Sequence, residues 1–254
     1  MSPLFDLRGR TALITGSVRG IGYSLAEGLA VAGANVIIDG RQQTAVDEAV
    51  AKLKAAGHCA EGIVFDVVDE EAVTRAFACL DARDVAVDIL INNAGIQFRK
   101  PMVELDVKDW QRVIDTNLTG AFIVGREAAK RMIPRNRGKI INIGSLTSEA
   151  ARATVAPYTA AKGGIKMLTR SMAAEWAKHN IQANAIGPGY ILTEMNTALI
   201  ENAEFDAWVR SSNPAGRWGK PDELAGTAVY LASEAANYVN GQIIYVDGGW
   251  LSVL

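Results

Sequence analysis

Short runs of β-branched and other apolar residues alternate along the chain with longer segments in which apolar residues recur every three or four positions. The short runs predict strands at residues 10–15, 35–39, 60–65, 88–92, 138–145, 181–188 and 242–247. Several of these runs are almost wholly apolar, which is typical of strands that helices cover on both faces. The periodic segments predict helices at residues 20–33, 44–57, 70–82, 107–133, 156–179 and 221–233.

This alternation of strand and helix predicts a parallel sheet built by right-handed crossovers. We therefore expect an α/β protein with a doubly wound, Rossmann-type sheet of seven parallel strands and helices on both faces. No repeat or Pro/Ser-rich linker divides the sequence, so residues 1–254 are interpreted as a single domain. Residues 190–220 are the least regular stretch, and they follow the sixth expected strand. We expect them to form a substrate lid.

Composition narrows the classes of function. The 26 basic and 28 acidic residues give a net charge of −2, which disfavours a nucleic-acid binder. The apolar stretches are shorter than the ~20 residues that a membrane span needs, and the N-terminal residues do not resemble a signal peptide. The two cysteines and two histidines show no metal-ligand spacing. We expect a cytoplasmic protein that binds no metal, nucleic acid or membrane.

Three glycines lie between the first expected strand and the first expected helix, in the sequence "TGSVRGIG" (residues 15–22). Gly16, Gly20 and Gly22 allow a tight turn and a close approach of the backbone to a pyrophosphate. The N–H groups at the start of the helix then favour that anion. The motif predicts a dinucleotide site, although glycines at this spacing also fit a simple tight turn.

The end of the second expected strand, "IIDGR", bears on the choice between NAD and NADP. An acidic residue there would bind the 2′-hydroxyl of NAD, and Asp39 fits that role. Arg41 and Arg19 would instead favour the 2′-phosphate of NADP. The two signals conflict unless Asp39 points to the other side, and together they favour NADP over NAD.

The sequence "YTAAK" places Tyr158 and Lys162 four positions apart, on one face of an expected helix. A free phenol has a pKa of about 10 and is a poor base at neutral pH. An ammonium ~4 Å away, at an effective dielectric constant of ~20, would lower that pKa by about 3, of which desolvation would remove a part. The pair is either a proton-exchanging acid/base or a solvated helix face.

Two further polar residues stand at notable places. Ser145 ends the fifth expected strand, at the sheet edge where ligands bind in such folds, and could hold a substrate oxygen. Asn117 interrupts an apolar helical stretch and could bind a water that relays protons from Lys162. Alone, each would equally fit a loop serine or a core amide.

Together the motifs "TGSVRGIG", "NNAG", "YTAAK" and "GPGYILT" resemble the short-chain dehydrogenase/reductase family over essentially the whole chain. The resemblance implies a catalytic tetrad of Asn117, Ser145, Tyr158 and Lys162. Tyr158 is then the general acid/base, and Lys162 lowers its pKa and binds the nicotinamide ribose. Ser145 orients the substrate and Asn117 maintains the proton relay. The implied cofactor contacts are Gly16, Ser17, Arg19, Gly20, Ile21, Gly22, Arg41, Asp66, Val67, Asn93, Ala94, Gly95, Tyr158, Lys162, Pro188, Gly189, Ile191 and Thr193.

Within the family, the chain is most similar to the gluconate 5-dehydrogenases. That similarity implies an NADP- or NAD-dependent homotetramer that interconverts D-gluconate and 5-keto-D-gluconate. A sugar acid needs a cation for its carboxylate, and Arg99 or Arg152 could supply it. The expected substrate contacts are Ser145, Arg99, Glu149, Arg152 and Tyr158.

Two other functions stay open. A reductase of 3-oxoacyl chains on acyl-carrier protein, or of another polyol or ketone, would use the same tetrad. An acyl-carrier partner would call for a basic docking patch, and the near-neutral charge gives little support for one. A dinucleotide-sensing protein without enzymatic activity would have no need of all four tetrad residues.

Overall fold

The computed structural model describes residues 3–253, and its centre is one parallel sheet. The strand order is β3-β2-β1-β4-β5-β6-β7, and each neighbouring pair is parallel. The seven strands span Thr11–Ile14, Asn35–Gly40, Ala60–Val64, Ile89–Asn92, Gly138–Ile143, Ile181–Pro188 and Ile243–Val246. The predicted doubly wound α/β sheet is therefore confirmed.

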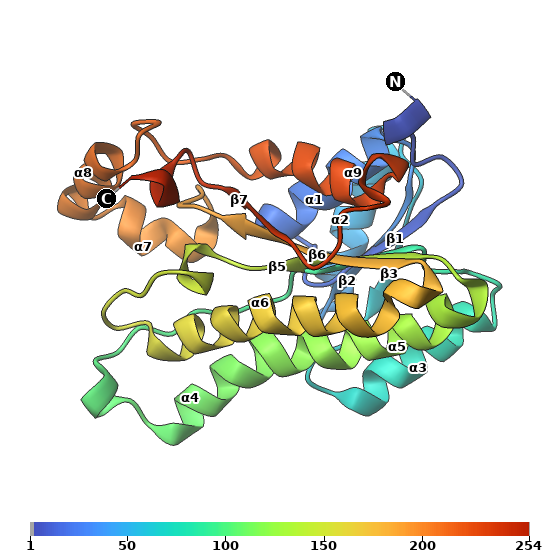
Figure 1. The fold of residues 1–254 in the computed structure, drawn as a ribbon, viewed down its shortest axis with the longest axis horizontal. Coiled ribbons are helices and arrows are strands. Elements are labelled where there is room, and N and C mark those ends of the chain that lie inside the picture. The colour runs from blue at the N-terminus through green and yellow to red at the C-terminus, as the bar shows by residue number, and fades with distance from the viewer. Residues whose placement is uncertain (1–2, 254) are drawn as a thin grey trace.

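Helices cover both faces of this sheet (Figure 1). On one face lie α1 (Gly20–Val31), α2 (Gln43–Ala55) and α9 (Ala225–Ala232), and on the other α3 (Glu70–Asp81), α4 (Val107–Ile114), α5 (Gly120–Arg135) and α6 (Ala156–Trp176). Successive strand residues serve opposite cores: Ile14 packs with α1 and α2, whereas Leu13 packs with α3 and α5. This two-sided burial explains the apolar runs in the sequence.

The long helix expected at residues 107–133 is not continuous. A π-helical segment, Asp115–Thr119, separates α4 from α5, and Asn117 lies in it. A π turn holds one extra residue, so it changes the direction in which its side chains point. The interruption therefore falls at the polar residue that interrupts the apolar pattern.

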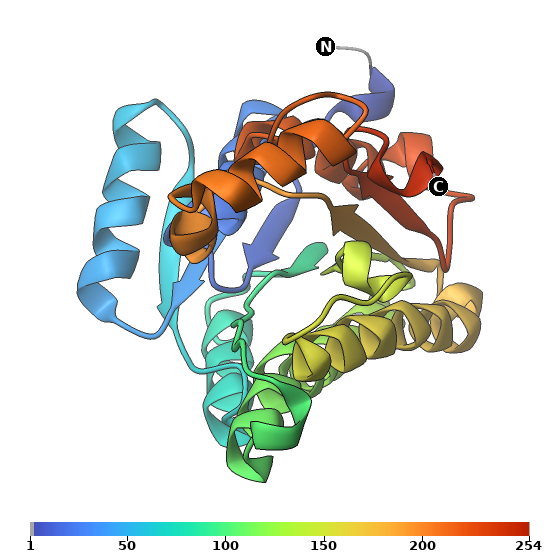
Figure 2. The ribbon, with the colours of Figure 1, turned by 90° about the vertical axis from the view of Figure 1, so that its left-hand side faces the viewer.

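Residues 190–220 contain two short helices that the sequence analysis did not predict, α7 (Thr197–Ile200) and α8 (Ala203–Ser212). They lie with the C-terminal segment beyond the carboxyl ends of the strands (Figure 1). Seen from that side, the α7–α8 segment lies in front of the strand ends (Figure 2).

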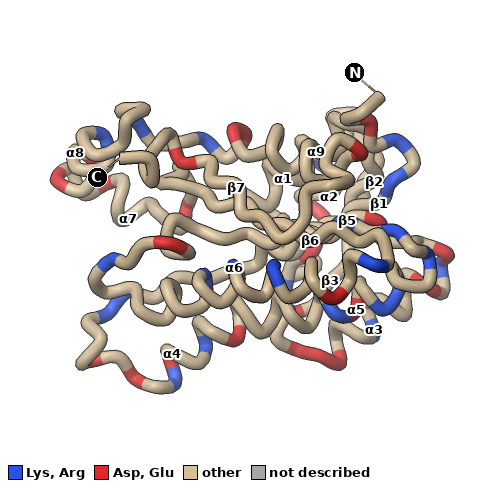
Figure 3. Tube along the Cα trace, in the orientation of Figure 1, with Lys and Arg blue, Asp and Glu red and all other residues tan. Residues whose placement is uncertain are grey.

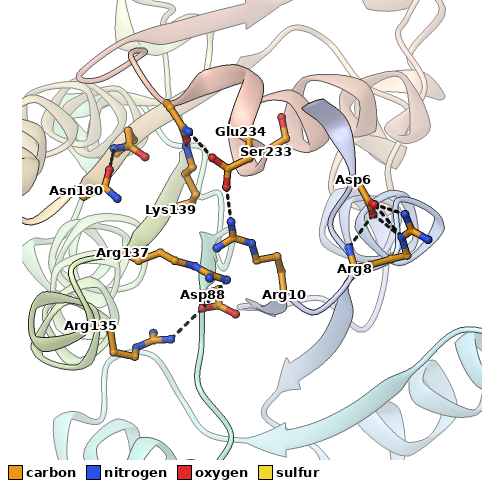
Figure 4. A network of polar contacts seen from close by, with 12 residues as sticks. Asp6, Arg8, Arg10, Asp88, Arg135, Arg137, Lys139, Asn180, Ser233 and Glu234 are labelled. Atoms are coloured by element: carbon orange, nitrogen blue, oxygen red, sulfur yellow. Dashed lines mark hydrogen bonds and ion pairs between the residues drawn. The ribbon is translucent and has the colours of Figure 1, made fainter. Parts of the chain in front are cut away.

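The opposite edge of the sheet, where the strands begin, is fixed by a network of ion pairs and hydrogen bonds (Figure 4). Asp88, just before β4, accepts from Arg135 at 2.9 Å and lies 3.5 Å from Arg137. Lys139 in β5 donates to Asn237 at 2.8 Å, and Arg10 pairs with Glu234. These charged and polar groups therefore satisfy one another at the edge where the strands begin.

Basic and acidic residues are interspersed over the outer elements (Figure 3). Within residues 3–253, no helix combines the length and apolarity that a membrane crossing requires. The same residues contain no group of three His, Cys, Asp or Glu side chains arranged to hold a metal ion.

Candidate active site

A cavity of about 730 Å³ opens at the carboxyl ends of the strands. Its wall is built by the glycine turn after β1, by the segments that follow β2, β3, β4, β5 and β6, and by the first turns of α6. This is the edge at which open α/β sheets bind ligands.

The glycine turn has the geometry that a dinucleotide needs. Gly16 and Gly20 have φ angles of +60° and +56°, which disfavour residues with a side chain. A Cβ on Gly22 would lie 2.4 Å from the Asn93 amide nitrogen, which donates to the carbonyl of Gly16 at 3.0 Å. No side chain caps the first turn of α1 in this part of the structure. Its N–H groups therefore face the cavity and fit a pyrophosphate.

Asp39 points back into the protein. Its side chain is 2% exposed, and its two oxygens accept from the N–H groups of Gly16 at 3.1 Å and Phe65 at 3.4 Å. Burial, and to a smaller extent the nearby Asp66 carboxylate, raises the pKa of this carboxyl group to about 7 against the lowering effect of the backbone hydrogen bonds. Asp39 is thus engaged with the glycine turn, which removes the conflict seen in the sequence.

Two arginines border the same end of the cavity. Arg19 lies 2.8 Å from Glu194, and Arg41 lies 3.9 Å from Asp66. Both guanidinium groups are more than 70% exposed, so these ion pairs are weak and can exchange for a phosphate. This end of the cavity is therefore suited to a ribose that carries a 2′-phosphate.

Tyr158 and Lys162 lie in the first two turns of α6 and face the cavity. The Lys162 ammonium is 5.4 Å from the centre of the Tyr158 ring and donates to the Ile143 carbonyl at 2.7 Å. Burial lowers the Lys162 pKa to about 8. Burial also raises the Tyr158 pKa, against the lowering effects of a hydrogen bond with Ser145 and of the Arg99 charge.

The expected lowering of the Tyr158 pKa by Lys162 is therefore not what the structure shows. That expectation allowed the loss of hydration to remove only part of the attraction between the phenol and the ammonium. In the folded chain, burial has the largest effect on the Tyr158 pKa and raises it. The phenol stays protonated at neutral pH, and the cationic influence on it comes from Arg99.

Asn117 connects the π-helical segment to the segment after β4. Its amide nitrogen donates to the carbonyls of Val113 and Ile96, both at 2.9 Å. Its carbonyl oxygen is buried without a hydrogen-bond partner in the described chain. Because buried acceptors without a partner are costly, this oxygen is suited to bind a water or a ligand hydroxyl.

The distal part of the cavity is cationic and aromatic. Arg152 donates to the Tyr190 hydroxyl at 3.2 Å and lies over the Phe205 ring of α8 at 4.8 Å. Arg99 is close enough to Arg152 for its pKa to be lowered, first by burial and then by that second charge. The Arg99 Nε is buried and has no partner in residues 3–253. Both guanidinium groups thus face the cavity, and neither forms an ion pair with a carboxylate of the described residues.

Comparison with known proteins gives a consistent picture. Residues 16–251 match the family described as Enoyl-(Acyl carrier protein) reductase. Gluconate 5-dehydrogenase of Gluconobacter oxydans (strain 621H) is 49% identical, over 97% of this chain and 96% of that protein. The chain belongs to the short-chain dehydrogenase/reductase family.

Two crystal structures closely resemble the structure of this chain. One, from Agrobacterium tumefaciens, is of a protein proposed to be a gluconate dehydrogenase; it is 68% identical and covers 99% of each chain, with a TM-score of 0.98. The other is a gluconate 5-dehydrogenase from Burkholderia cenocepacia J2315 in complex with NADP and tartrate. It is 48% identical over 99% of each chain, with a TM-score of 0.97.

The structure brings almost all expected residues of this short-chain dehydrogenase/reductase to the cavity. Those that line it are Gly16, Arg19, Gly20, Ile21, Gly22, Arg41, Asp66, Val67, Asn93, Ala94, Gly95, Arg99, Asn117, Ser145, Arg152, Tyr158, Lys162, Pro188, Gly189, Ile191 and Thr193. Their individual roles stay predictions.

Two expected residues lie elsewhere. Ser17 is buried and does not line the cavity, because its hydroxyl donates to the Ile14 carbonyl at 2.7 Å. Glu149 turns away towards α6 and β7, where it accepts from Lys166 at 2.5 Å and from Tyr245 at 2.8 Å. The structure therefore does not support the prediction that Glu149 contacts the substrate.

Several polar residues of the cavity wall were not predicted from the sequence, and two of them are Thr147 and Tyr190. Thr147 has a buried hydroxyl without a partner in the described residues, and Tyr190 carries the hydroxyl that Arg152 contacts. Thr147 follows the predicted Ser145 by two positions, and Tyr190 follows the predicted Gly189 by one. Proximity to those motifs was the only available signal.

Proposed function

We propose that the chain is an NADP-dependent oxidoreductase that interconverts D-gluconate and 5-keto-D-gluconate. The observation that carries this proposal is the distribution of buried polar atoms without partners. Three of those found in the described chain line the cavity: Arg99 Nε, Asn117 Oδ1 and Thr147 Oγ1. A polyhydroxylated carboxylate supplies both an anion and hydroxyl groups to such atoms.

Tyr158 is proposed as the general acid of ketone reduction. Its raised pKa keeps the phenol protonated, so it can donate a proton to the ketone oxygen. Ser145, which lies beside this phenol and acts to lower its pKa, would hold the same oxygen in place. When bound, the nicotinamide exchanges a hydride with the adjacent substrate carbon.

Lys162 and Asn117 are proposed to complete the tetrad. With a pKa of about 8, Lys162 can both hold and release a proton near neutral pH. The free oxygen of Asn117 is suited to keep a water between Lys162 and solvent. In alcohol oxidation the same residues would carry the proton in the reverse direction.

The choice of NADP rests on the end of the cavity that Arg19 and Arg41 border. Both carry exposed guanidinium groups, and Asp39 is turned away from them into the glycine turn. A 2′-phosphate can therefore meet two cations there. The NADP complex of the Burkholderia cenocepacia relative supports this choice.

Arg152 and Arg99 are proposed to bind the substrate carboxylate. Arg152 is held from two sides, by Tyr190 and by the Phe205 ring. A held guanidinium loses less conformational entropy on binding a carboxylate in a two-pronged geometry. Tartrate, a hydroxy acid, accompanies NADP in the same relative and supports a site for hydroxy acids.

Residues 190–220 are proposed to act as the substrate lid of a single domain. Tyr190 from the start of this segment packs against Phe205 and Trp208 of α8 at ring distances of 5.7 and 5.8 Å. Phe205 also lies under the guanidinium of Arg152, which is proposed to bind the carboxylate. Closure of α8 and binding of the carboxylate would therefore support each other.

A cytoplasmic homotetramer is proposed as the working form. Phe122 on α5 and Met167 on α6 are 44% and 55% exposed, and the two helices lie side by side on one face of the molecule (Figure 1). Exposed apolar residues on adjacent helices are suited to a subunit interface. Size-exclusion chromatography with light scattering measures the assembly directly.

The principal alternative is reduction of a 3-oxoacyl chain or of an uncharged polyol or ketone. A long acyl chain would favour an apolar channel, whereas two guanidinium groups line the distal part of this cavity. A protein that only senses dinucleotides would not need a protonated Tyr158 beside Ser145. Neither alternative accounts for the unpartnered Arg99 Nε.

The test is a comparison of turnover across substrates and both cofactors. The purified protein is assayed with D-gluconate, 5-keto-D-gluconate, neutral polyols and a 3-oxoacyl thioester, and reduced nicotinamide is followed by absorbance. We expect the highest kcat/KM for the sugar acid with NADP. A higher kcat/KM for the thioester or for a neutral polyol would refute the proposal.

A further inference from the structure

Ser148 is a buried serine behind the cavity wall that links two residues of the proposed tetrad. It is 9% exposed, and it does not itself line the cavity. Its hydroxyl accepts from the N–H of Ser145 at 3.2 Å and donates to the carbonyl of Lys162 at 2.8 Å. One hydroxyl group therefore connects the segment after β5 to α6.

Lys162 holds the segment after β5 at two points. Its ammonium donates to the carbonyl of Ile143 at 2.7 Å, before Ser145, and its own carbonyl accepts from Ser148, after Ser145. Ser145 is therefore enclosed between two hydrogen bonds to one residue of α6. Since Tyr158 lies about one helical turn before Lys162, these two bonds also fix where Ser145 stands relative to the phenol.

The short 3₁₀ turn Leu146–Ser148 sets the direction of the Ser145 hydroxyl. The oxygen of that hydroxyl accepts from the N–H of Thr147 at 3.2 Å, and the N–H of Ser148 donates to the Ser145 carbonyl at 2.9 Å. A hydroxyl that accepts from a backbone N–H keeps its own proton to donate. The Ser145 proton is therefore available for a substrate oxygen while this turn is closed, and the Ser148 hydroxyl closes it from the other side.

We propose that Ser148 is a positioning residue, which acts on the reaction by holding Ser145 beside Tyr158. The inference rests on the proposed roles of Ser145 and Tyr158 in proton transfer. Alanine at position 148 would leave the Ser145 N–H without its partner and remove the bond to Lys162, so the segment after β5 could shift against α6. A shift of about 1 Å can cost about 100-fold in rate, because reacting groups must be closely aligned.

Ser148→Ala tests the proposal in the whole protein, with NADPH and the ketone of the substrate panel that the wild type reduces fastest. We expect kcat to fall by about 10–100-fold. The Kd of NADP, measured by calorimetry, should change little, because Ser148 does not line the cavity. Ser148→Cys keeps the size of the side chain and forms weaker hydrogen bonds, so it should show a smaller fall in kcat. It is the test variant if Ser148→Ala folds poorly.

Thr169→Val is the matched control on the same helix. The Thr169 hydroxyl is buried and accepts from Asn142 of β5 at 2.9 Å, so its removal breaks another contact between β5 and α6. Thr169 lies about two helical turns beyond Lys162, on the side away from Tyr158. Both substitutions should lower the midpoint of urea unfolding, and only Ser148→Ala should lower kcat. An equal loss of kcat in the two variants, or an unchanged kcat in Ser148→Ala, would overturn the inference.

The double variant with Ser145→Ala shows whether Ser148 acts through Ser145. If it does, Ser148→Ala should lower kcat much less when the Ser145 hydroxyl is already absent. The same fold-loss in both backgrounds would indicate a general disturbance of the site and would overturn the inference. Normal activity of Ser148→Ala beside an impaired Ser145→Ala would overturn it and leave the proposed function intact. A normal kcat in Ser145→Ala would refute the proposed tetrad, and this inference with it.

Discussion

The ammonium group of Lys162 lies 5.4 Å from the centre of the Tyr158 ring and is hydrogen-bonded to the carbonyl of Ile143. Burial lowers the pKa of the lysine to about 8 and raises that of the tyrosine. Each group is thus closer to its neutral form than in water. The pair is set up to donate a proton from the phenol, which is the step that ketone reduction needs.

Replacing Tyr158 by Phe should remove that proton. Because general acid catalysis contributes a factor of about 10²–10⁴, we expect kcat for reduction of 5-keto-D-gluconate to fall by about that factor. The Kd of NADP should change little, since the phenol is at the substrate end of the cavity. Steady-state kinetics and calorimetry measure the two quantities, and near-normal turnover in this variant would contradict the assignment.

Replacing Lys162 by Met should stabilise the folded chain at neutral pH while abolishing most of the activity. The folded pKa of about 8 lies below the usual 10.5, so protonation favours the unfolded chain. This group therefore adds full stability above pH 10.5 and loses it as the pH falls through 8. The cost at pH 7 is up to about 3 kcal/mol.

Urea unfolding of wild type and Lys162→Met at pH 7 and pH 9.5 tests this point. The advantage of the variant should be largest at pH 7 and should shrink at pH 9.5. Met occupies a similar volume, and loss of the hydrogen bond to Ile143 offsets part of the gain. A variant that is less stable than wild type at pH 7 would show that burial of this ammonium is fully compensated.

The sheet could be predicted from the sequence because buried parallel strands need continuous apolar runs, and the crossover rule then leaves few arrangements. The π-helical segment Asp115–Thr119 could not be predicted in this way. Apolar periodicity does not distinguish a π turn from an α turn over five residues. The helix α8 escaped prediction because its large apolar residues, Phe205, Trp208 and Val209, extend over only about one helical turn.

The site was predictable where backbone geometry determines function, as at the glycine turn. The site was harder to predict where the direction of a side chain decides whether that side chain reaches the cavity. Ser17 and Glu149 lie beside motif residues in the chain, yet hydrogen bonds to Ile14 and Tyr245 turn them away from the cavity. The raised pKa of Tyr158 depends on burial, which the i, i+4 spacing alone does not reveal.

Replacing Arg152 by Lys should weaken binding of the sugar acid. Lysine keeps the charge and loses the planar group that lies over Phe205 and donates to Tyr190. We expect KM for D-gluconate to rise by about 10–100-fold, as for loss of a charge-assisted hydrogen bond. The KM of a neutral polyol, if it is a substrate, should change much less.

Glu149→Gln is the matched control for this prediction. Glu149 was expected at the substrate from its position in the sequence, and the structure pairs it with Lys166 and Tyr245 outside the cavity. Its substitution should leave KM and kcat within about twofold of wild type and lower the free energy of unfolding by about 1 kcal/mol, as for an exposed ion pair and a hydrogen bond. A large rise in KM would show that Glu149 contributes to substrate binding.

Replacing Tyr190 by Phe tests whether Arg152 is positioned by its neighbours. The ring of Tyr190 packs against Phe205, Trp208, Trp218 and Trp250 at centroid distances of 4.8–5.8 Å, and phenylalanine preserves these contacts. Only the hydroxyl that accepts from Arg152 is removed. A positioning role predicts that KM for D-gluconate rises about 3–10-fold, as for one hydrogen bond, with kcat nearly unchanged.

A purely structural role for Tyr190 would give a different result. The free energy of unfolding would then fall and both kinetic constants would change together or not at all. Combining Tyr190→Phe with Arg152→Lys separates the two cases, because the hydroxyl can act on the substrate only through the guanidinium. In the positioning case the double variant should have the same KM as Arg152→Lys alone, and additive effects would show that Tyr190 contacts the substrate independently.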